Sequence, residues 1–266
     1  MPRFAANLSL LFTELPLLDR FAAARAAGFA ACEMQFPYAE PKETLAARRA
    51  EAGLPLVLHN LPPGDWAAGE RGIAIFPERI AEFRDGVARA IDYAGALGCR
   101  QINCLAGLAP PGAERARLRA TLSENLAYAA DALGEAGIRL LIEPINDRDM
   151  PGFFLNRLTE AAAVIEAVGS DNLFIQADLY HMAMMGEDPA ESLAAHRDRI
   201  AHVQIADAPG RHEPGTGTID FPAAFAALDR LGYDGFIGCE YLPASTVEDG
   251  LPELRAMAEA FDRAAA

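Results

Sequence analysis

The chain alternates between short apolar segments and longer amphipathic segments over its whole length. The apolar segments predict strands, and the segments between them, rich in alanine, arginine and glutamate, predict helices. Strict alternation requires a parallel sheet, and eight strand–helix units in 266 residues predict an α/β fold, a single (β/α)8 TIM barrel spanning residues 1–266 as one domain. The strands are expected over 4–10, 31–36, 55–60, 100–105, 138–144, 173–178, 200–207 and 235–241. The helices are expected over 16–27, 41–52, 77–97, 114–136, 156–168, 188–197, 221–231 and 248–263.

The composition narrows the classes of function. The net charge is −15, and an acidic protein repels phosphate backbones, so nucleic-acid binding is disfavoured. Lys42 is the only lysine and falls at the start of an expected surface helix, which argues against Schiff-base chemistry. The four cysteines form no CxxC pair, and neither a signal peptide nor an apolar run long enough to span a membrane is evident. We therefore expect a reduced, cytoplasmic protein with no membrane partner.

Four successive expected strands each deliver an oxygen-bearing side chain near the carboxyl end. The fifth ends in Glu143, the sixth in Asp178, the seventh carries Gln204 and the eighth ends in Glu240. In a barrel, chemistry takes place at this end. Alternation along each strand places these side chains inside the barrel, because the opposite orientation would bury them without partners among the helices.

Three carboxylates and an amide that converge in a partly dry site need a cation or protonation to coexist. Oxygen ligands favour Mg²⁺ or Mn²⁺ over zinc, so the sequence predicts a divalent-metal site. The alternative is that each carboxylate forms a separate salt bridge with an arginine.

The same segments resemble the hydroxypyruvate isomerase family, one of the xylose-isomerase-like barrels. The resemblance runs from end to end and is carried by the motifs EPIN (143–146), DLYHM (178–182), HVQIAD (202–207), PGRHEPGTG (209–217) and CEY (239–241). It implies that the metal ligands are Glu143, Asp178, Gln204 and Glu240, of which Glu143 and Glu240 are also catalytic. It further implies substrate contacts by His181 and Arg211. Related sugar epimerases carry a histidine where Gln204 stands.

The chemistry that follows is the isomerisation of hydroxypyruvate to 2-hydroxy-3-oxopropanoate (tartronate semialdehyde) through a cis-enediolate. The metal would act as a Lewis acid, and the two glutamates would move the proton between neighbouring carbons. Sequence does not assign the acid and the base, although we favour Glu240 as base and Glu143 as acid. Arg211 would hold the substrate carboxylate, and His59, at the end of the third strand, is a further candidate for lining the pocket.

Several alternatives stay open at this stage. The nearest is the same reaction on a longer acid, as in a 2-oxo-tetronate isomerase, and the next is a ketose 3-epimerase or a dehydratase. A metal-dependent abasic-site endonuclease would need more histidine ligands and a basic face, and a non-catalytic barrel would not need both glutamates. Relatives commonly form dimers or tetramers, so a homo-oligomer is an expectation from resemblance alone. The long loop over 60–77 is expected on the active-site face, with Trp66 either anchoring it or covering the substrate.

Overall fold

The chain folds into a barrel of eight parallel strands, which confirms the predicted fold. The computed structural model describes residues 3–265, so residues 1, 2 and 266 of the predicted domain lie outside the described residues. The sheet order is β2-β1-β8-β7-β6-β5-β4-β3. The strands are β1 (Arg3–Asn7), β2 (Ala31–Glu33), β3 (His59–Asn60), β4 (Gln101–Cys104), β5 (Arg139–Ile142), β6 (Leu173–Asp178), β7 (Ile200–Ile205) and β8 (Phe236–Cys239).

The barrel closes between β2 and the segment that leads into β3. The amide of Cys32 donates to the Pro55 carbonyl at 2.9 Å, and the amide of Val57 donates back to the Cys32 carbonyl at 2.9 Å. Farther along, the Asn60 amide donates to the Gln35 carbonyl at 2.8 Å. The predicted third strand is therefore paired along its length, although its regular part is only two residues long.

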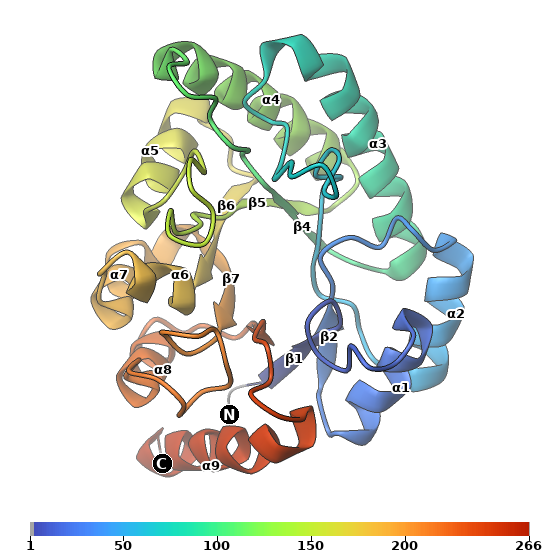
Figure 1. Ribbon diagram of the computed structural model, residues 1–266, viewed down its shortest axis with the longest axis vertical. Coiled ribbons are helices and arrows are strands. Elements are labelled where there is room, and N and C mark those ends of the chain that lie inside the picture. Colours follow the sequence, from blue (N-terminus) through green and yellow to red (C-terminus); the bar gives the residue numbers. More distant parts are fainter. Residues whose placement is uncertain (1–2, 266) are drawn as a thin grey trace.

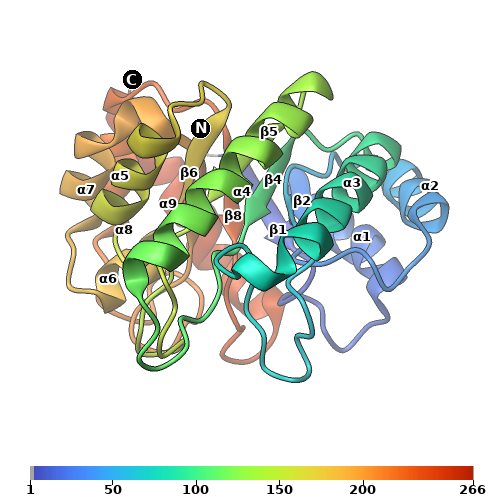
Figure 2. The same cartoon turned by 90° about the horizontal axis from the view of Figure 1, so that it is seen from above.

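Helices surround the strands on all sides (Figure 1) and cross the barrel wall obliquely (Figure 2). They are α1 (Leu17–Ala26), α2 (Lys42–Ala52), α3 (Ile80–Leu97), α4 (Arg115–Glu135), α5 (Leu158–Val168), α6 (Leu179–Met184), α7 (Pro189–Ala195), α8 (Phe221–Arg230) and α9 (Val247–Ala265). Two short 3-10 turns, η1 (Pro77–Arg79) and η2 (Arg197–Arg199), precede α3 and β7. No helix within residues 3–265 combines the length and the apolar character that crossing a membrane requires.

The eight expected helices are all present, and α6 is an addition that the sequence pattern missed. It has six residues, too few for a helical periodicity to be recognised. Its start is fixed by Asp178, whose Oδ1 accepts a hydrogen bond from the Tyr180 amide at 2.8 Å and so caps the helix. One carboxylate therefore ends a strand and begins a helix, and this places His181 in the first turn above the barrel.

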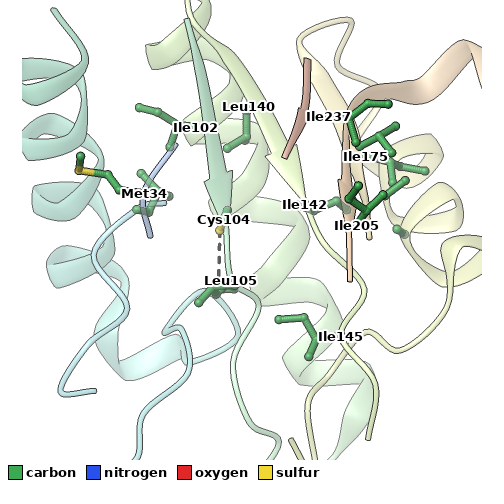
Figure 3. Packing of buried hydrophobic residues seen from close by; sticks show 14 of the residues in the cluster. Met34, Ile102, Cys104, Leu105, Leu140, Ile142, Ile145, Ile175, Ile205 and Ile237 are labelled. Atoms are coloured by element: carbon green, nitrogen blue, oxygen red, sulfur yellow. Dashed lines mark hydrogen bonds between the residues drawn. The ribbon is translucent and has the colours of Figure 1, made fainter. Parts of the chain in front are cut away.

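The main apolar core lies between the strands and the helices (Figure 3). Burying one such side chain contributes about 1.5–3 kcal/mol, so this layer supplies much of the stability of the fold. β-branched side chains dominate its strand side because they pack well on a pleated surface. The isoleucines that represent this layer in the consecutive strands β4 to β8 are Ile102, Ile142, Ile175, Ile205 and Ile237, each 3% exposed or less.

Near the carboxyl ends of the strands, one level of the barrel interior has a different composition, with small and polar residues. Asp178 pairs in register with Gln204, which pairs with Gly238, and Gly238 pairs with Ala5 on β1. Residues in register point to the same side of the sheet, so these positions meet at one level of the interior. This confirms the predicted inward orientation of the polar strand residues and places the site at the carboxyl ends of the strands.

Candidate active site

A cavity of about 260 Å³ opens at the carboxyl ends of the strands. Both predicted catalytic glutamates, Glu143 and Glu240, line it, together with His181 and Arg211. Its volume suits a small acid. The remaining lining residues are Leu10, Gln35, Phe36, Asn60, Trp66, Leu105, Ile145, Met150 and Leu242.

Glu33, at the end of β2, is fully buried and lies at the centre of a hydrogen-bond network. Its Oε1 accepts from Gln204 Nε2 at 2.7 Å and from Asn7 Nδ2 at 3.0 Å. Its Oε2 lies 2.7 Å from His202 Nε2. Three polar partners thus surround one carboxylate inside the barrel, which is what a buried charge requires.

Gly238 makes room for this network. A Cβ atom at this position would lie 2.3 Å from Glu33 Oε2, closer than any real contact. The Glu33 carboxylate fills the space that the missing side chain of Gly238 leaves in the barrel interior.

Glu240 follows β8 and is also well supplied with partners. Its Oε1 accepts from Gln35 Nε2 at 2.9 Å and from Asn7 Nδ2 at 3.1 Å. Its Oε2 accepts from Arg211 Nη2 at 2.9 Å. Part of the alternative arrangement, a carboxylate paired with an arginine, is therefore present at Glu240.

Glu143 and Asp178 have fewer partners than Glu33 and Glu240. Glu143 Oε2 accepts from Asn103 Nδ2 at 2.9 Å. Asp178 uses Oδ1 to cap α6, but its buried Oδ2 has no hydrogen-bond partner among residues 3–265, and Arg211 Nη2 is 3.9 Å away. A buried carboxylate oxygen without a donor is costly, so this part of the site fits a bound cation.

The pKa values follow from this environment. Burial raises the pKa of Glu143 well above its usual range, and the nearby charges of Glu240 and Asp178 raise it further. Burial raises the pKa of Asp178 to about 7, although Arg211 opposes the shift, and burial also raises the pKa of Glu240. Burial lowers the pKa of His181 well below its usual value, and Arg211 adds to the shift. The site therefore contains a neutral histidine beside carboxyl groups whose pKa values lie above their usual range, with Arg211 opposing the shift at Asp178 and Glu240.

The tautomer of His181 follows from Asn146. The Asn146 Oδ1 already accepts from the amides of Arg148, at 3.0 Å, and Asp149, at 2.8 Å, so its Nδ2 is the end that lies 2.7 Å from His181 Nδ1. Since Nδ2 donates, Nδ1 accepts, and the proton of the neutral ring is on Nε2. The Nε2–H group then faces Asp178 Oδ2 at 3.7 Å and Glu143 Oε1 at 3.9 Å.

The described residues contain one cluster of carboxylate and histidine atoms spaced to hold a metal ion, formed by Glu143, Asp178 and His181, with ligand atoms within 4.8 Å of one another. Because Nε2 of His181 carries its proton, the two carboxylates are the better ligands. The predicted ligand Gln204 is buried nearby, but its Oε1 accepts from Gln176 Nε2 at 2.5 Å. Gln204 would have to exchange this contact to reach a metal.

His59 does not occupy the place that the sequence predicted. It is absent from the lining of the cavity, and its ring packs edge-on against Tyr38, with centroids 6.0 Å apart. Tyr38 in turn contacts Tyr93 of α3, so His59 faces the helix layer, and its neighbour Asn60 lines the cavity. The reason is the alternation of side chains along the strand. The prediction of His59 as a substrate contact is corrected to Asn60 as a cavity-lining residue.

Sequence reasoning missed other polar residues of the site, among them Asn7 and Asn103, although the same signal could have found them. These two stand at or next to the carboxyl ends of β1 and β4, as the predicted residues do on β5 to β8. Trp66 lines the cavity and packs on Phe36 with ring centroids 5.0 Å apart, so it both anchors its loop and faces the site.

Comparisons with known proteins agree with this geometry. Residues 21–262 match the model of the xylose isomerase-like TIM barrel family. A 2-oxo-tetronate isomerase of Cupriavidus necator is 51% identical over 255 residues, covering 96% of this chain and 98% of that protein. A hydroxypyruvate isomerase of Escherichia coli is 50% identical over 251 residues, covering 94% and 97%. A crystal structure described as an AP endonuclease, family 2, from Brucella melitensis has a TM-score of 0.94 at 43% identity and covers 96% of this chain and 99% of that one.

The chain therefore belongs to the xylose isomerase-like TIM barrel family, and within it to the group that contains the hydroxypyruvate and 2-oxo-tetronate isomerases. The resemblance inferred from the strand-end motifs is confirmed.

Proposed function

We propose that this protein is an aldose–ketose isomerase that converts hydroxypyruvate into 2-hydroxy-3-oxopropanoate. The observation that carries the proposal is the pair of buried carboxyl groups with raised pKa values, Glu143 and Glu240, facing one small cavity. Buried carboxyl groups with raised pKa values can take up and return protons during a reaction. Both relatives reported above carry the names of isomerases, which supports this class of reaction.

The unequal surroundings of the two glutamates support their roles. Glu240 accepts three hydrogen bonds, one of them from an arginine, which favours the ionised form and a role as base. Glu143 accepts from neutral amides, those of Asn103 and Gln176, and burial raises the pKa of this carboxyl well above its usual range, which favours the protonated form and a role as acid. Glu240 would remove the proton from the hydroxyl-bearing carbon, and Glu143 would return one to the neighbouring carbon of the enediolate.

His181 and Arg211 would position the substrate. The Nε2–H of neutral His181 can donate to a substrate oxygen at the point where negative charge develops. The Arg211 guanidinium can hold the substrate carboxylate in a bidentate manner, and three carboxylates raise the pKa of Arg211 despite its burial, so it stays charged.

A divalent cation fits beside these residues because Asp178 Oδ2 has no partner and the remaining donors are oxygens. Glu143, Asp178, Gln204 and Glu240 would hold it, and all-oxygen ligands favour Mg²⁺ or Mn²⁺. When bound, such an ion would polarise two adjacent substrate oxygens.

A 2-oxo-tetronate is the second candidate substrate, favoured by the 51% identity to an isomerase of that name. Both acids present the same α-keto-β-hydroxy unit to the two glutamates. We do not propose nucleic acid as a partner, because the net charge of −15 opposes binding to a phosphate backbone. A ketose 3-epimerase is less well supported, since Gln204 stands where the related epimerases carry a histidine.

The test is solvent exchange followed by NMR in deuterium oxide. Metal-stripped protein would be given hydroxypyruvate or a 2-oxo-tetronate, with and without Mn²⁺ or Mg²⁺, while deuterium incorporation and product formation are recorded. We expect metal-dependent exchange and isomerisation of one of these acids, and the preferred acid identifies the substrate. Exchange with neither acid, on protein that binds the metal, would overturn the proposal.

A further inference from the structure

The opposite end of the barrel carries a second cavity, of about 660 Å³, at the amino ends of the strands. The N-terminus marks this end in Figure 2, on the far side from the long loops that follow the strands. Its lining includes one carboxylate, Asp234, and four arginines from different parts of the chain, which are Arg3, Arg100, Arg139 and Arg197. We propose that this cavity binds a polyvalent oxyanion, at a site separate from the active site.

The charge of this cavity is opposite to that of the molecule as a whole. The chain has a net charge of −15, whereas four arginines and one aspartate give the cavity lining a formal charge of +3. Like charges gathered around one opening repel one another unless an anion balances them. A local positive field in an acidic protein therefore points to a small anion as the ligand.

Two of the arginines have no acidic partner. Within the described part of the chain, no carboxylate lies within salt-bridge distance of Arg100 or Arg139, although the protein contains 38 acidic residues. Arg197 contacts Asp198, with Nε and Oδ1 3.3 Å apart, and both side chains are more than half exposed. Arg3 donates to the backbone carbonyl of Asp234. Most of the guanidinium donors around the cavity are therefore available to a ligand.

The backbone brings Arg100 and Arg139 to neighbouring positions at the amino ends of β4 and β5. The amide of Arg139 donates to the Arg100 carbonyl at 2.9 Å. The Arg100 guanidinium lies beside Gly137, where a Cβ would make an ordinary contact, 3.5 Å from Nη1. Arg139 pairs in register with Gln101, so the side chains of Arg100 and Arg139 leave opposite faces of the sheet and reach the cavity from two directions.

Aromatic rings hold two guanidinium groups in place without using their N–H donors. The Arg3 guanidinium lies 4.5 Å from the centroid of the Phe236 ring, and that of Arg139 lies 5.7 Å from the centroid of Phe174. Stacking on an aromatic face orients the guanidinium and leaves its edge free to bind oxygen. Arg3 is on β1 and Arg139 on β5, so the two guanidinium groups reach the cavity from different sides of the amino end of the barrel.

These contacts favour an anion with at least two negative charges on oxygen, such as a phosphate group or a dicarboxylate. A single carboxylate would leave several guanidinium groups unpaired. Both chemistries offer the oxygen pairs that a guanidinium binds in a bidentate manner, so the experiment has to distinguish them.

The test is isothermal titration calorimetry of the full chain, loaded with Mn²⁺, at low ionic strength. The probes are inorganic phosphate and succinate, and each is titrated into the wild type and into the double variant Arg100→Ala/Arg139→Ala. We expect the double variant to bind at least about tenfold more weakly, because two charge-assisted contacts are lost. Arg117→Ala/Arg119→Ala, on α4, removes the same charge away from the cavity and should bind as the wild type does.

Two further measurements separate this site from the active site. Arg211→Ala should retain the binding, and the Arg100→Ala/Arg139→Ala variant should retain turnover. Binding of phosphate alone assigns a phosphate ligand, binding of succinate alone assigns a dicarboxylate, and binding of both assigns divalent oxyanions in general. Absence of binding by either probe, or equal affinity in the wild type and the cavity variant, would overturn the proposal.

Discussion

At the carboxyl ends of the strands, the carboxylates on the two sides of the barrel differ in their hydrogen-bond partners. On the β1, β2 and β8 side, Glu33 and Glu240 each have three polar partners, supplied by amides, a histidine and an arginine. On the β5 and β6 side, Glu143 accepts from two neutral amides, those of Asn103 and Gln176, and Asp178 has a buried oxygen with no hydrogen-bond partner among the described residues. All four carboxylates are buried to a similar degree.

The difference shows that burial alone does not identify a reactive carboxylate. Glu33 is the most buried of the four, yet its partners are complete, and it organises the interior around Gly238. The carboxylates on the β5 and β6 side have fewer hydrogen-bond partners among the described residues, and a bound ligand would complete their contacts. Incomplete hydrogen bonding in a site that faces a cavity is therefore the better indicator of function.

The strongest test of this contrast is Glu143→Gln. We expect kcat to fall by about 10³-fold or more, because the amide keeps the shape but cannot supply a proton. Glu240→Gln should have a similar effect, and the exposed Glu248→Gln is the control. The measurement is steady-state turnover with the preferred acid, alongside circular dichroism. Near-normal turnover in Glu143→Gln would remove this residue from the mechanism.

The same replacement of glutamate by glutamine at Glu33, on the β1, β2 and β8 side, should lower the stability of the fold. In Glu33→Gln the new amide nitrogen, which is itself a donor, faces groups that now donate hydrogen bonds to the Glu33 carboxylate. We therefore expect the free energy of unfolding to fall by about 2 kcal/mol. Urea denaturation measures it, with Glu51→Gln as the control, since Glu51 forms an exposed pair with Arg48. An unfolding free energy equal to that of the wild type would show that the network around Glu33 is not structural.

Asn146→Ala tests whether the histidine tautomer matters. Without the Asn146 amide that donates to His181 Nδ1, the ring proton can move from Nε2 to Nδ1. We therefore expect kcat to fall by about tenfold with a small change in KM. Asn156→Ala is the matched control, because it removes an amide of the same loop that donates to the Ile145 carbonyl. If both variants lose the same activity, the effect is a disturbance of the loop and not of the tautomer.

The smallest expected effect is a pH dependence of metal affinity. The pKa of Asp178 is raised to about 7, above its unfolded value, so the carboxyl holds a proton below pH 7 that a metal must displace. Affinity for Mn²⁺ should therefore level off above about pH 8 and fall by about tenfold between pH 8 and pH 6. Calorimetric titration at several pH values measures it. Asp178→Asn should bind weakly with a flatter profile, and a steep profile in that variant would assign the proton to another group.

The sequence by itself determined the order of elements and the orientation of the strand residues. Alternation of apolar and amphipathic segments is a local property, and so is the parity that turned Glu143, Asp178, Gln204 and Glu240 inward. Alternation also explains why His59 was misplaced, since one residue along a strand reverses the side on which a side chain lies. The short helix α6 escaped because six residues carry too little periodicity.

Only the tertiary structure decided which polar groups meet. Asn7 lies 26 positions from Glu33 and 233 from Glu240, yet one amide of Asn7 donates to both. The tautomer of His181, the pairing of Arg211 with Glu240, and the arginines that gather at the amino end of the barrel all depend on distances across the closed sheet. Barrel closure brings together residues whose separation along the chain carries no information about their separation in space. For this reason, the sequence predicted the chemistry that each strand end contributes, and the fold determined which contributions act together.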